Sequence, residues 1–138
     1  MPNLANLFFR GALVFFAIGI AMGLYMSLTH DFTLRPVHVH VNLLGWVSLF
    51  LYAAFYKLYP AAAETRLAKI HFWSAMIGLP PMMIGLAFLV HGNEAVGVPL
   101  LLAGEAGVAI AVALFIYIGF RATARTASAF TGTLVPAE

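Results

Sequence analysis

The sequence contains no cysteine and few charged residues. Without cysteine the chain forms neither a disulfide nor an iron–sulfur cluster, and it cannot attach haem covalently through a C-x-x-C-H motif. Charged residues make up 9% of the chain, whereas soluble domains contain about 25%, and 63% of the residues are hydrophobic. This composition argues against a soluble domain and indicates a protein of the lipid bilayer.

Four apolar runs are each long enough to cross the hydrocarbon core, which takes about 20 helical residues. They cover residues 7–28, 36–59, 67–90 and 96–120. The first run is too long for a removable signal peptide and lacks a small-residue cleavage site. We therefore expect an all-α integral membrane protein, with four transmembrane helices in residues 1–121 and a mobile cytoplasmic tail, rich in Ala and Thr, in residues 122–138.

The positive charges sort to one side once the four spans are threaded through a membrane. The cations at this face are Arg10, Lys57, Arg66, Lys69, Arg121 and Arg125. Only Arg35 falls at the opposite face. By the positive-inside rule both termini lie in the cytoplasm, which predicts a multi-pass protein of the bacterial inner membrane. The pI of about 9.2 then reflects membrane orientation and does not indicate a nucleic-acid partner.

Two histidines, His38 and His40, lie near the start of the second span. An ionisable side chain inside a membrane helix is costly and indicates function. A separation of two residues turns an α-helix by about 200°, so the rings point to nearly opposite sides and do not share one metal ion. This arrangement suits two flat ligands flanking the helix, such as haems, better than zinc. The alternative is a pair of interfacial histidines hydrated from the outer loop.

Other side chains near these histidines complete the candidate cofactor site. Gly45 lies nearly two α-helical turns after His38, where a missing side chain would leave room for a macrocycle. Trp46 and the aromatic residues that follow it could line such a site, although aromatic stripes in membrane helices also arise from packing alone. Arg35 is a candidate partner for haem propionates or an interfacial anchor.

The remaining ionisable residues divide by depth. His30 and His91 fall at the outer surface, where either is a surface residue, a second axial ligand or part of a copper site. His71 lies about one turn inside the opposite face, too far to form an axial pair with His40 of the same copy, and we expect it to hydrogen-bond to a neighbouring helix or a lipid. Glu105 lies deep in the fourth span and is a candidate for proton chemistry or a helix–helix hydrogen bond.

The string HVHVNLLGWVSLFLYAAFYKLYP at residues 38–60, with IHFW at residues 70–73, resembles the tenth and eleventh helices of the catalytic subunit of haem–copper oxidases. The C-family oxidases and the nitric oxide reductases are the most similar. In that family the first histidine of H-x-H ligates a high-spin haem and the second a low-spin haem, so the resemblance implies these roles for His38 and His40. The stretch HVNLL, which contains Asn42, also resembles the family's second helix, where the other low-spin ligand lies.

The resemblance covers about forty residues and implies an oligomer. The oxidase subunit has twelve helices in three arcs of four, so a four-helix chain that resembles one arc implies a homotrimer. Each copy would direct His38 towards one neighbour and His40 towards the other, with non-covalent haem b at each interface. Gly19 and Gly23 in the first span have the spacing of a close helix contact, either within the chain or between copies.

The sequence therefore predicts a membrane b-type haem protein that transfers electrons or senses redox state or gas near the outer face, with an electron donor that the sequence does not identify. A six-coordinate iron suits electron transfer, whereas an open position suits gas binding. One alternative is a small nitric oxide or oxygen reductase, for which His30, His91 and Glu105 are the candidates for a second metal or acid. Another is a cofactor-free channel or transporter subunit, with Glu105 and a break at Pro80–Pro81 forming the path.

Overall fold

The computed structural model describes residues 3–133, with side chains through residue 124, and all regular structure in this range is helical. Four helices are long and apolar enough to cross a membrane, namely Leu4–Thr29, Arg35–Leu58, Arg66–Val90 and Glu94–Ala124. They coincide with the four predicted spans apart from a few residues at the ends. The expected all-α fold with four transmembrane-length helices is confirmed.

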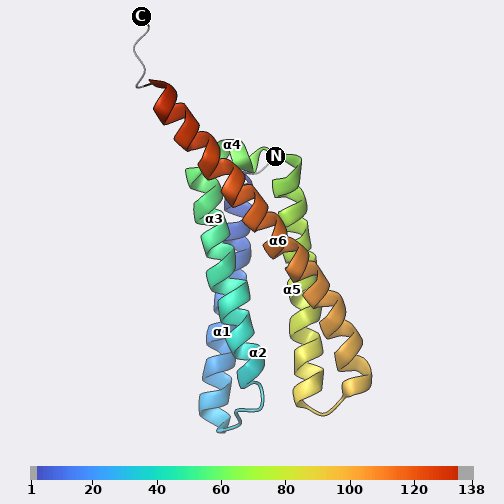
Figure 1. Cartoon of the computed structure of the whole chain (residues 1–138). Coiled ribbons are helices and arrows are strands. Elements are labelled where there is room, and N and C mark those ends of the chain that lie inside the picture. The colour runs from blue at the N-terminus through green and yellow to red at the C-terminus, as the bar shows by residue number, and fades with distance from the viewer. Residues whose placement is uncertain (1–2, 134–138) are drawn as a thin grey trace, which may run out of the picture.

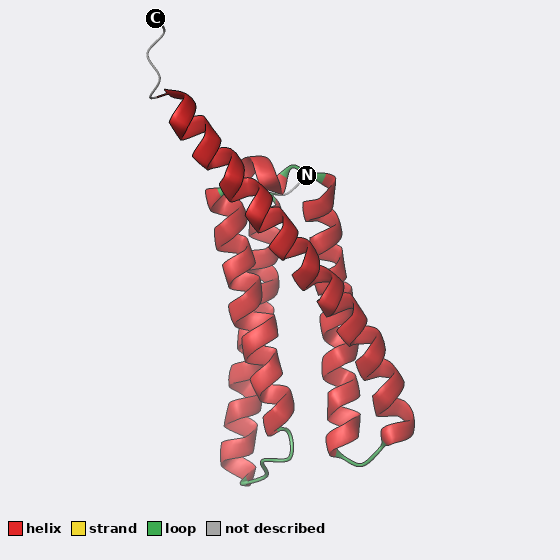
Figure 2. Ribbon diagram, viewed as in Figure 1, coloured by secondary structure: helices red, strands yellow, loops and turns green. Residues whose placement is uncertain are grey.

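The second span consists of three consecutive segments with different helical geometry. The elements in chain order are α1 (Leu4–Thr29), α2 (Arg35–His40), the π-helical η1 (Val41–Ser48), α3 (Leu49–Leu58), α4 (Pro60–Ala63), α5 (Arg66–Val90) and α6 (Glu94–Thr133). Figure 1 shows α1 beside α2 and α3, and α5 beside α6, with α4 joining the two pairs at one end. The two other connections are short loops at the opposite end (Figure 2).

Side-chain caps fix where the helices begin. The Asn3 side chain accepts a hydrogen bond from the backbone N–H of Ala5 at the start of α1, and Thr65 accepts one from Ala68 at the start of α5. Such caps satisfy N–H groups that have no partner within the helix. At the other end of α1, His30 adopts a left-handed conformation with φ of 54°, which ends the helix.

Glycines bring the backbones of α5 and α6 into direct contact. A Cβ atom at Gly78 would lie 2.8 Å from the backbone nitrogen of Val108, and one at Gly104 would overlap the backbone of Met82. These contacts lie on both sides of Pro80–Pro81. The sequence predicted an interruption at the two prolines, but α5 continues through them, because packing against α6 holds the helix together across the missing N–H donors.

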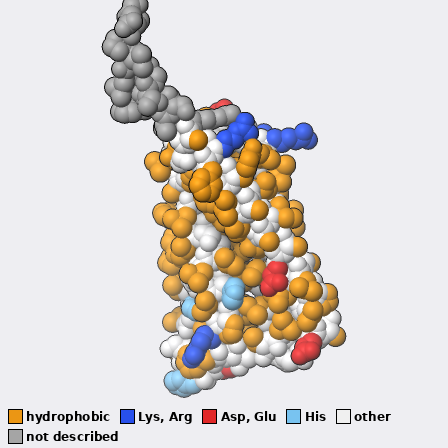
Figure 3. Space-filling model, in the orientation of Figure 1, with side chains coloured by type: hydrophobic (Ala, Val, Ile, Leu, Met, Phe, Trp, Pro, Cys, Tyr) orange, Lys and Arg blue, Asp and Glu red, His pale blue; other side chains and the backbone are white. Residues whose placement is uncertain are grey.

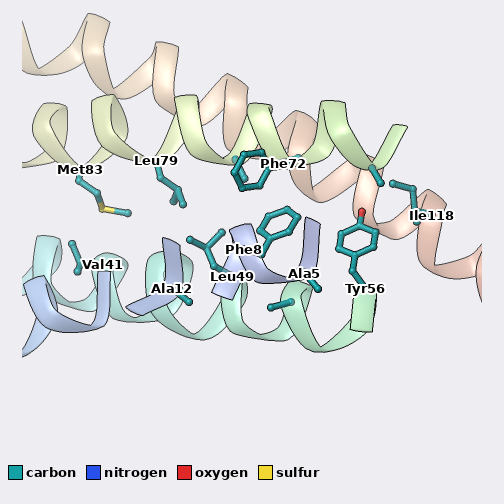
Figure 4. Close-up of a cluster of buried hydrophobic side chains, with 14 of the residues drawn as sticks. Ala5, Phe8, Ala12, Val41, Leu49, Tyr56, Phe72, Leu79, Met83 and Ile118 are labelled. Atoms are coloured by element: carbon teal, nitrogen blue, oxygen red, sulfur yellow. The ribbon is translucent and has the colours of Figure 1, made fainter. Parts of the chain in front are cut away.

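The core lies where α1, α3 and α5 meet. Figure 4 shows Phe8 of α1 between the two other helices, near Phe72 and Leu49. Phe8 is fully buried, stacks on Tyr56 with ring centroids 5.6 Å apart and meets Phe72 edge-on at 5.0 Å. Aromatic pairs at these separations add about 0.5–1.5 kcal/mol beyond the area they bury. This aromatic cluster fixes how the three helices meet.

Helix α6 crosses the bundle obliquely and continues to Thr133 (Figure 1). The sequence predicted that the transmembrane domain would end at residue 121, and α6 itself continues past this position as a helix, where alanine, the strongest helix former, is abundant. Residues 134–138 of the expected tail lie outside the described residues. Helix α1 begins and α6 ends at the same end of the bundle, as four spans require.

Charges and apolar side chains divide the surface into a hydrophobic belt and two polar ends. Figure 3 shows Lys and Arg gathered at the end where α5 begins, with hydrophobic side chains covering most of the length below it. Arg66 and Lys69 belong to this end, whereas Arg35 begins the second span at the other. Large apolar residues such as Leu24 and Ile77 are exposed in the belt. An apolar surface that extends along most of the bundle faces lipid or protein.

Candidate functional site

The ring of His38 packs into a notch on α1. A Cβ atom at Gly23 would lie 3.2 Å from Cε1 of His38, and one at Gly19 would lie 2.5 Å from Oδ1 of Asn42. The Asn42 amide donates a hydrogen bond of 2.8 Å to the His38 carbonyl oxygen and lies 3.4 Å from Nδ1 of the ring. The two glycines therefore serve packing within one chain, which was one of the two roles expected for them.

A backbone carbonyl holds one ring nitrogen of His40. Its Nδ1 lies 2.7 Å from the carbonyl oxygen of Pro36. Because a carbonyl oxygen only accepts, Nδ1 carries the proton and Nε2 carries the lone pair that ligates a metal. Histidine ligands in proteins commonly donate their other N–H to a carbonyl in this way. His40 is half-buried, and its place in the second span therefore suits a ligand.

His91 shows the same ring-to-carbonyl bond, 2.7 Å from the oxygen of Ala87, but it is exposed at the end of α5. The bond alone is thus common to two histidines, and the depth of His40 in the second span distinguishes it. His38 and His40 have different surroundings. The His38 ring lies against α1. The His40 ring turns its Nδ1 to the Pro36 carbonyl of its own helix, so its Nε2 points away from that carbonyl.

Gly45 and Trp46, which the sequence predicted to line a cofactor site, both pack against α1. Gly45 is buried, and a Cβ atom there would lie 2.5 Å from the ring of Phe15 on α1. Phe15 therefore fills the space expected for a macrocycle. Trp46 packs on Phe16 of α1 with ring centroids 4.5 Å apart and on Phe50 at 5.3 Å. Both residues hold the second span against the first.

The π-helical segment η1 is a feature that the sequence did not predict. It begins directly after His40 and includes eight residues. Stretches of π-helix are rare and occur frequently at functional sites. The Ser48 hydroxyl donates a hydrogen bond of 2.8 Å to the carbonyl oxygen of Leu43, five residues earlier. Polar residues such as Asn42 and Ser48 inside an apolar helix were the available sequence signal, because they bond to the backbone when no water is present.

The loop between α1 and α2, which contains Asp31, and the loop between α5 and α6, which contains His91, lie at the same end of the bundle as Arg35. The Asp31 carboxylate accepts hydrogen bonds from the Thr33 hydroxyl at 2.6 Å and from the Thr33 backbone N–H at 2.9 Å, which hold its pKa below the ordinary value of 3.8. The charge of His91 in the second loop lowers the pKa of Asp31 further. The guanidinium carbon of Arg35 lies 5.3 Å from the ring centroid of Phe32. Arg35 is exposed and lies five residues before His40.

Copper ligands are not assembled in the part of the chain that the structure describes. No group of three or more His, Cys, Asp or Glu residues there is placed to hold a metal ion. His30 and His91, the residues considered for copper, are both exposed at loop ends.

His71 lies in an aromatic cage far from the other histidines. It is fully buried, and its Nδ1 is joined to the Tyr56 hydroxyl by a hydrogen bond of 2.9 Å. Rings of Phe8, Tyr52 and Phe115 surround it at centroid distances of 4.5–5.5 Å, and its Nε2 has no hydrogen-bond partner. The sequence predicted a bond to a neighbouring helix for His71. Tyr52 and Tyr56, two of the aromatic residues that follow Trp46 in the second span, line this cage.

Glu105 projects from α6 into the hydrophobic belt. It is exposed, although the preceding residue, Gly104, is buried against α5. Gly104 contacts α5 one residue before Met83, and Figure 4 shows Met83 opposite Val41, the residue after His40. Glu105 and His40 therefore lie at a similar height in the bundle. A carboxyl group exposed at this depth is costly unless another surface covers it.

Comparison of the chain with protein-family models, curated proteins and solved structures gives no match. The assignment of function therefore rests on the residues and contacts described above. The resemblance to the oxidase catalytic subunit remains an expectation from the sequence.

Proposed function

We propose that this chain is a membrane b-type haem protein in which His40 ligates the haem iron, and that it transfers electrons or senses redox state or gas. The observation that carries the proposal is the orientation of the His40 ring. Its Nδ1 donates to the Pro36 carbonyl at 2.7 Å, which leaves Nε2 with a free lone pair inside a membrane span. A bound haem b would supply one-electron chemistry or a site for a diatomic gas.

Within one chain, a haem fits at His40 only on the side of the second span that faces away from α1. The α1 side is closed, because His38 occupies the notch at Gly23 and Phe15 covers Gly45. A planar ligand at His40 would therefore lie on the side of the second span that faces away from α1. Its second face would need cover from lipid or from another copy.

The exposed carboxyl of Glu105 supports cover by another copy. It lies at a similar height to His40 and interrupts an otherwise apolar stretch of α6. A second chain that covers Glu105 would remove the carboxyl group from lipid, and it would lie at the level of the His40 site. A closed homotrimer, the assembly that the resemblance implies, meets both needs.

Arg35 and the sorting of cations support the orientation. Arg35 lies about one and a half helical turns from His40 along the same span, within reach of the propionate edge of a macrocycle that His40 ligates. The opposite end, with Lys57, Arg66 and Lys69, would face the cytoplasm of a bacterial inner membrane. The haem would then lie near the outer face.

The test is the optical spectrum of the purified, reduced protein with and without carbon monoxide. A Soret band with sharp α and β bands that the gas does not move means a six-coordinate iron, in which another copy supplies the second ligand and the function is electron transfer. A Soret band that shifts with the gas means an open position and favours gas sensing or reduction. Absence of haem absorption from protein expressed with sufficient haem would refute the proposal.

Three variants separate the histidines. We expect His40→Ala to abolish haem binding, because the ring that presents Nε2 is lost. His91→Ala is the matched control, since it removes a ring with the same carbonyl bond at the exposed end, and we expect it to retain the full haem content. His38→Ala should also retain haem, because its ring packs against Gly23. Equal loss of haem in the His38 and His40 variants would contradict the assignment to His40.

A further inference from the structure

A cavity of 630 Å3 lies at the end of the bundle where α4 joins the two helix pairs. Ligand pockets typically have volumes of about 300–1,000 Å3. Figure 1 shows α4 at this end, with the upper half of α6 passing nearby. The lining residues come from the end of α3, from α4 and from α5 and α6, and they include Leu58, Tyr59, Arg66, Leu67, Ile118 and Arg121.

Two arginines give this cavity a positive rim. Arg66 and Arg121 are both exposed, and Nη1 of Arg121 donates a hydrogen bond of 3.1 Å to the Tyr117 hydroxyl, which orients the guanidinium. Within residues 3–124, no acidic residue lines the cavity and neither arginine forms an ion pair. A guanidinium group has a planar fork of donors that matches the oxygens of a phosphate.

The walls of the cavity are apolar and continue into the hydrophobic belt. Leu58, the last residue of α3, is 76% exposed, and Ile118 of α6 is buried. A ligand that fits therefore carries a negative headgroup at the arginines and a hydrocarbon chain towards the membrane. A soluble phosphate compound would leave these walls uncovered.

A neighbouring cavity of 1050 Å3 at the same end provides a comparison. Lys57 and Lys69 line it, but so does Glu64, whose carboxylate opposes an anion. Its cations are lysines, which act as point charges without a fixed fork. The first cavity therefore has the stronger complementarity to a phosphate group.

We propose that the cavity between Arg66 and Arg121 binds the phosphate headgroup of an anionic phospholipid, with an acyl chain along Leu58 and Ile118. The site is independent of haem, because it lies at the opposite end of the spans from His40. It would hold a lipid of one leaflet at the junction of α4, α5 and α6. Basic pockets between membrane helices are known to select such headgroups.

The experiment is native mass spectrometry of the purified chain in detergent, with phosphatidylglycerol and phosphatidylcholine added separately. The key variant is Arg66→Gln/Arg121→Gln, and the matched control is Lys57→Gln/Lys69→Gln, which removes the same charge from the neighbouring cavity. We expect the arginine variant to bind phosphatidylglycerol about 30-fold more weakly and the lysine variant to bind it within about threefold of the parent chain. The parent chain should bind phosphatidylcholine more weakly than phosphatidylglycerol.

Equal losses of phosphatidylglycerol binding in the arginine and lysine double variants would overturn the proposal, because they would show that the lipid is attracted to the basic end of the bundle in general. Equal binding of both lipids would also overturn it. Competition by soluble glycerol phosphate at concentrations matching the lipid would show a free-phosphate site and reject the lipid assignment. If Arg66→Gln/Arg121→Gln does not fold, Arg66→Lys/Arg121→Lys keeps the charge and removes the planar guanidinium donors. Unchanged binding of phosphatidylglycerol by this lysine variant would reject a contact between the guanidinium groups and the phosphate.

Discussion

Tyr56 and His71 join the second and third spans by a single hydrogen bond of 2.9 Å in the buried core. Both side chains are almost completely inaccessible, and the rings of Phe8 and Phe115 lie against the imidazole. The other ring nitrogen, Nε2, has no partner. His71 is therefore held by one polar contact and by aromatic packing.

Replacing Tyr56 with phenylalanine tests this bond. We expect Tyr56→Phe to lower the free energy of unfolding by about 1–3 kcal/mol, because it leaves Nδ1 of His71 buried without a partner. The measurement is thermal or denaturant unfolding of the chain in detergent, followed by circular dichroism. Tyr52→Phe is the matched control, since Tyr52 contacts the same ring only edge-on. Equal destabilisation by both changes would mean that the hydroxyl of Tyr56 contributes nothing specific.

The α5–α6 contact predicts a difference between two glycines of one helix. Gly104→Ala should destabilise the chain by about 1–3 kcal/mol, because its Cβ would overlap the backbone of Met82, which cannot rotate away. Gly119→Ala meets no atom within 4 Å and should instead stabilise α6, by up to about 1 kcal/mol. The unfolding measurement used for Tyr56 serves here. We expect the free energy of unfolding to fall in Gly104→Ala and to rise in Gly119→Ala. A change of the same sign in both variants would contradict the packing described.

The loop between α1 and α2 predicts a measurable pKa. Thr33→Val removes the hydroxyl that donates to Asp31 at 2.6 Å, so the pKa of Asp31 should rise towards 3.8. Because the folded pKa is depressed, these bonds stabilise the loop above the unfolded pKa, and the stabilisation is lost as pH falls through the folded value. The measurement is an NMR titration of the Asp31 carboxyl carbon in micelles.

Thr29→Val is the matched control for this titration. The Thr29 hydroxyl accepts a hydrogen bond from the Asp31 backbone N–H and does not contact the carboxylate. We expect the pKa of Asp31 to stay at its depressed value in this variant. A rise as large as that in Thr33→Val would assign the depression to loop geometry as a whole.

Glu105 predicts how the chains assemble. If another copy covers this carboxyl, Glu105→Leu removes a polar contact worth about 1–2 kcal/mol and should shift the purified protein from an oligomer towards monomers by roughly tenfold. Ile116→Leu, at an exposed apolar position of the same helix, is the control and should leave the mass unchanged. The measurement is light scattering after gel filtration. A parent chain that is already monomeric would exclude the proposed trimer.

The sequence by itself determined the membrane class, the number of spans and, to within a few residues, their limits. Long apolar runs and scarce charge suffice for this, because the bilayer imposes both length and polarity on a helix. The expected sorting of cations and the depth of His40, His71 and Glu105 follow from the same argument, since depth is proportional to position along a helix. These properties are local to each span.

Only the tertiary structure decided which side chains meet. Phe15 covers Gly45, Gly23 faces His38 and Tyr56 reaches His71, and each pair joins different helices. The π-helical turns of η1 add to this, because they change the faces that an α-helical count would assign. In lipid, the apolar pattern does not mark the inward face of a helix, so contacts follow from the shapes of small and aromatic side chains. Shape complementarity between helices is a property of pairs of spans, and the order of residues in one span does not specify it.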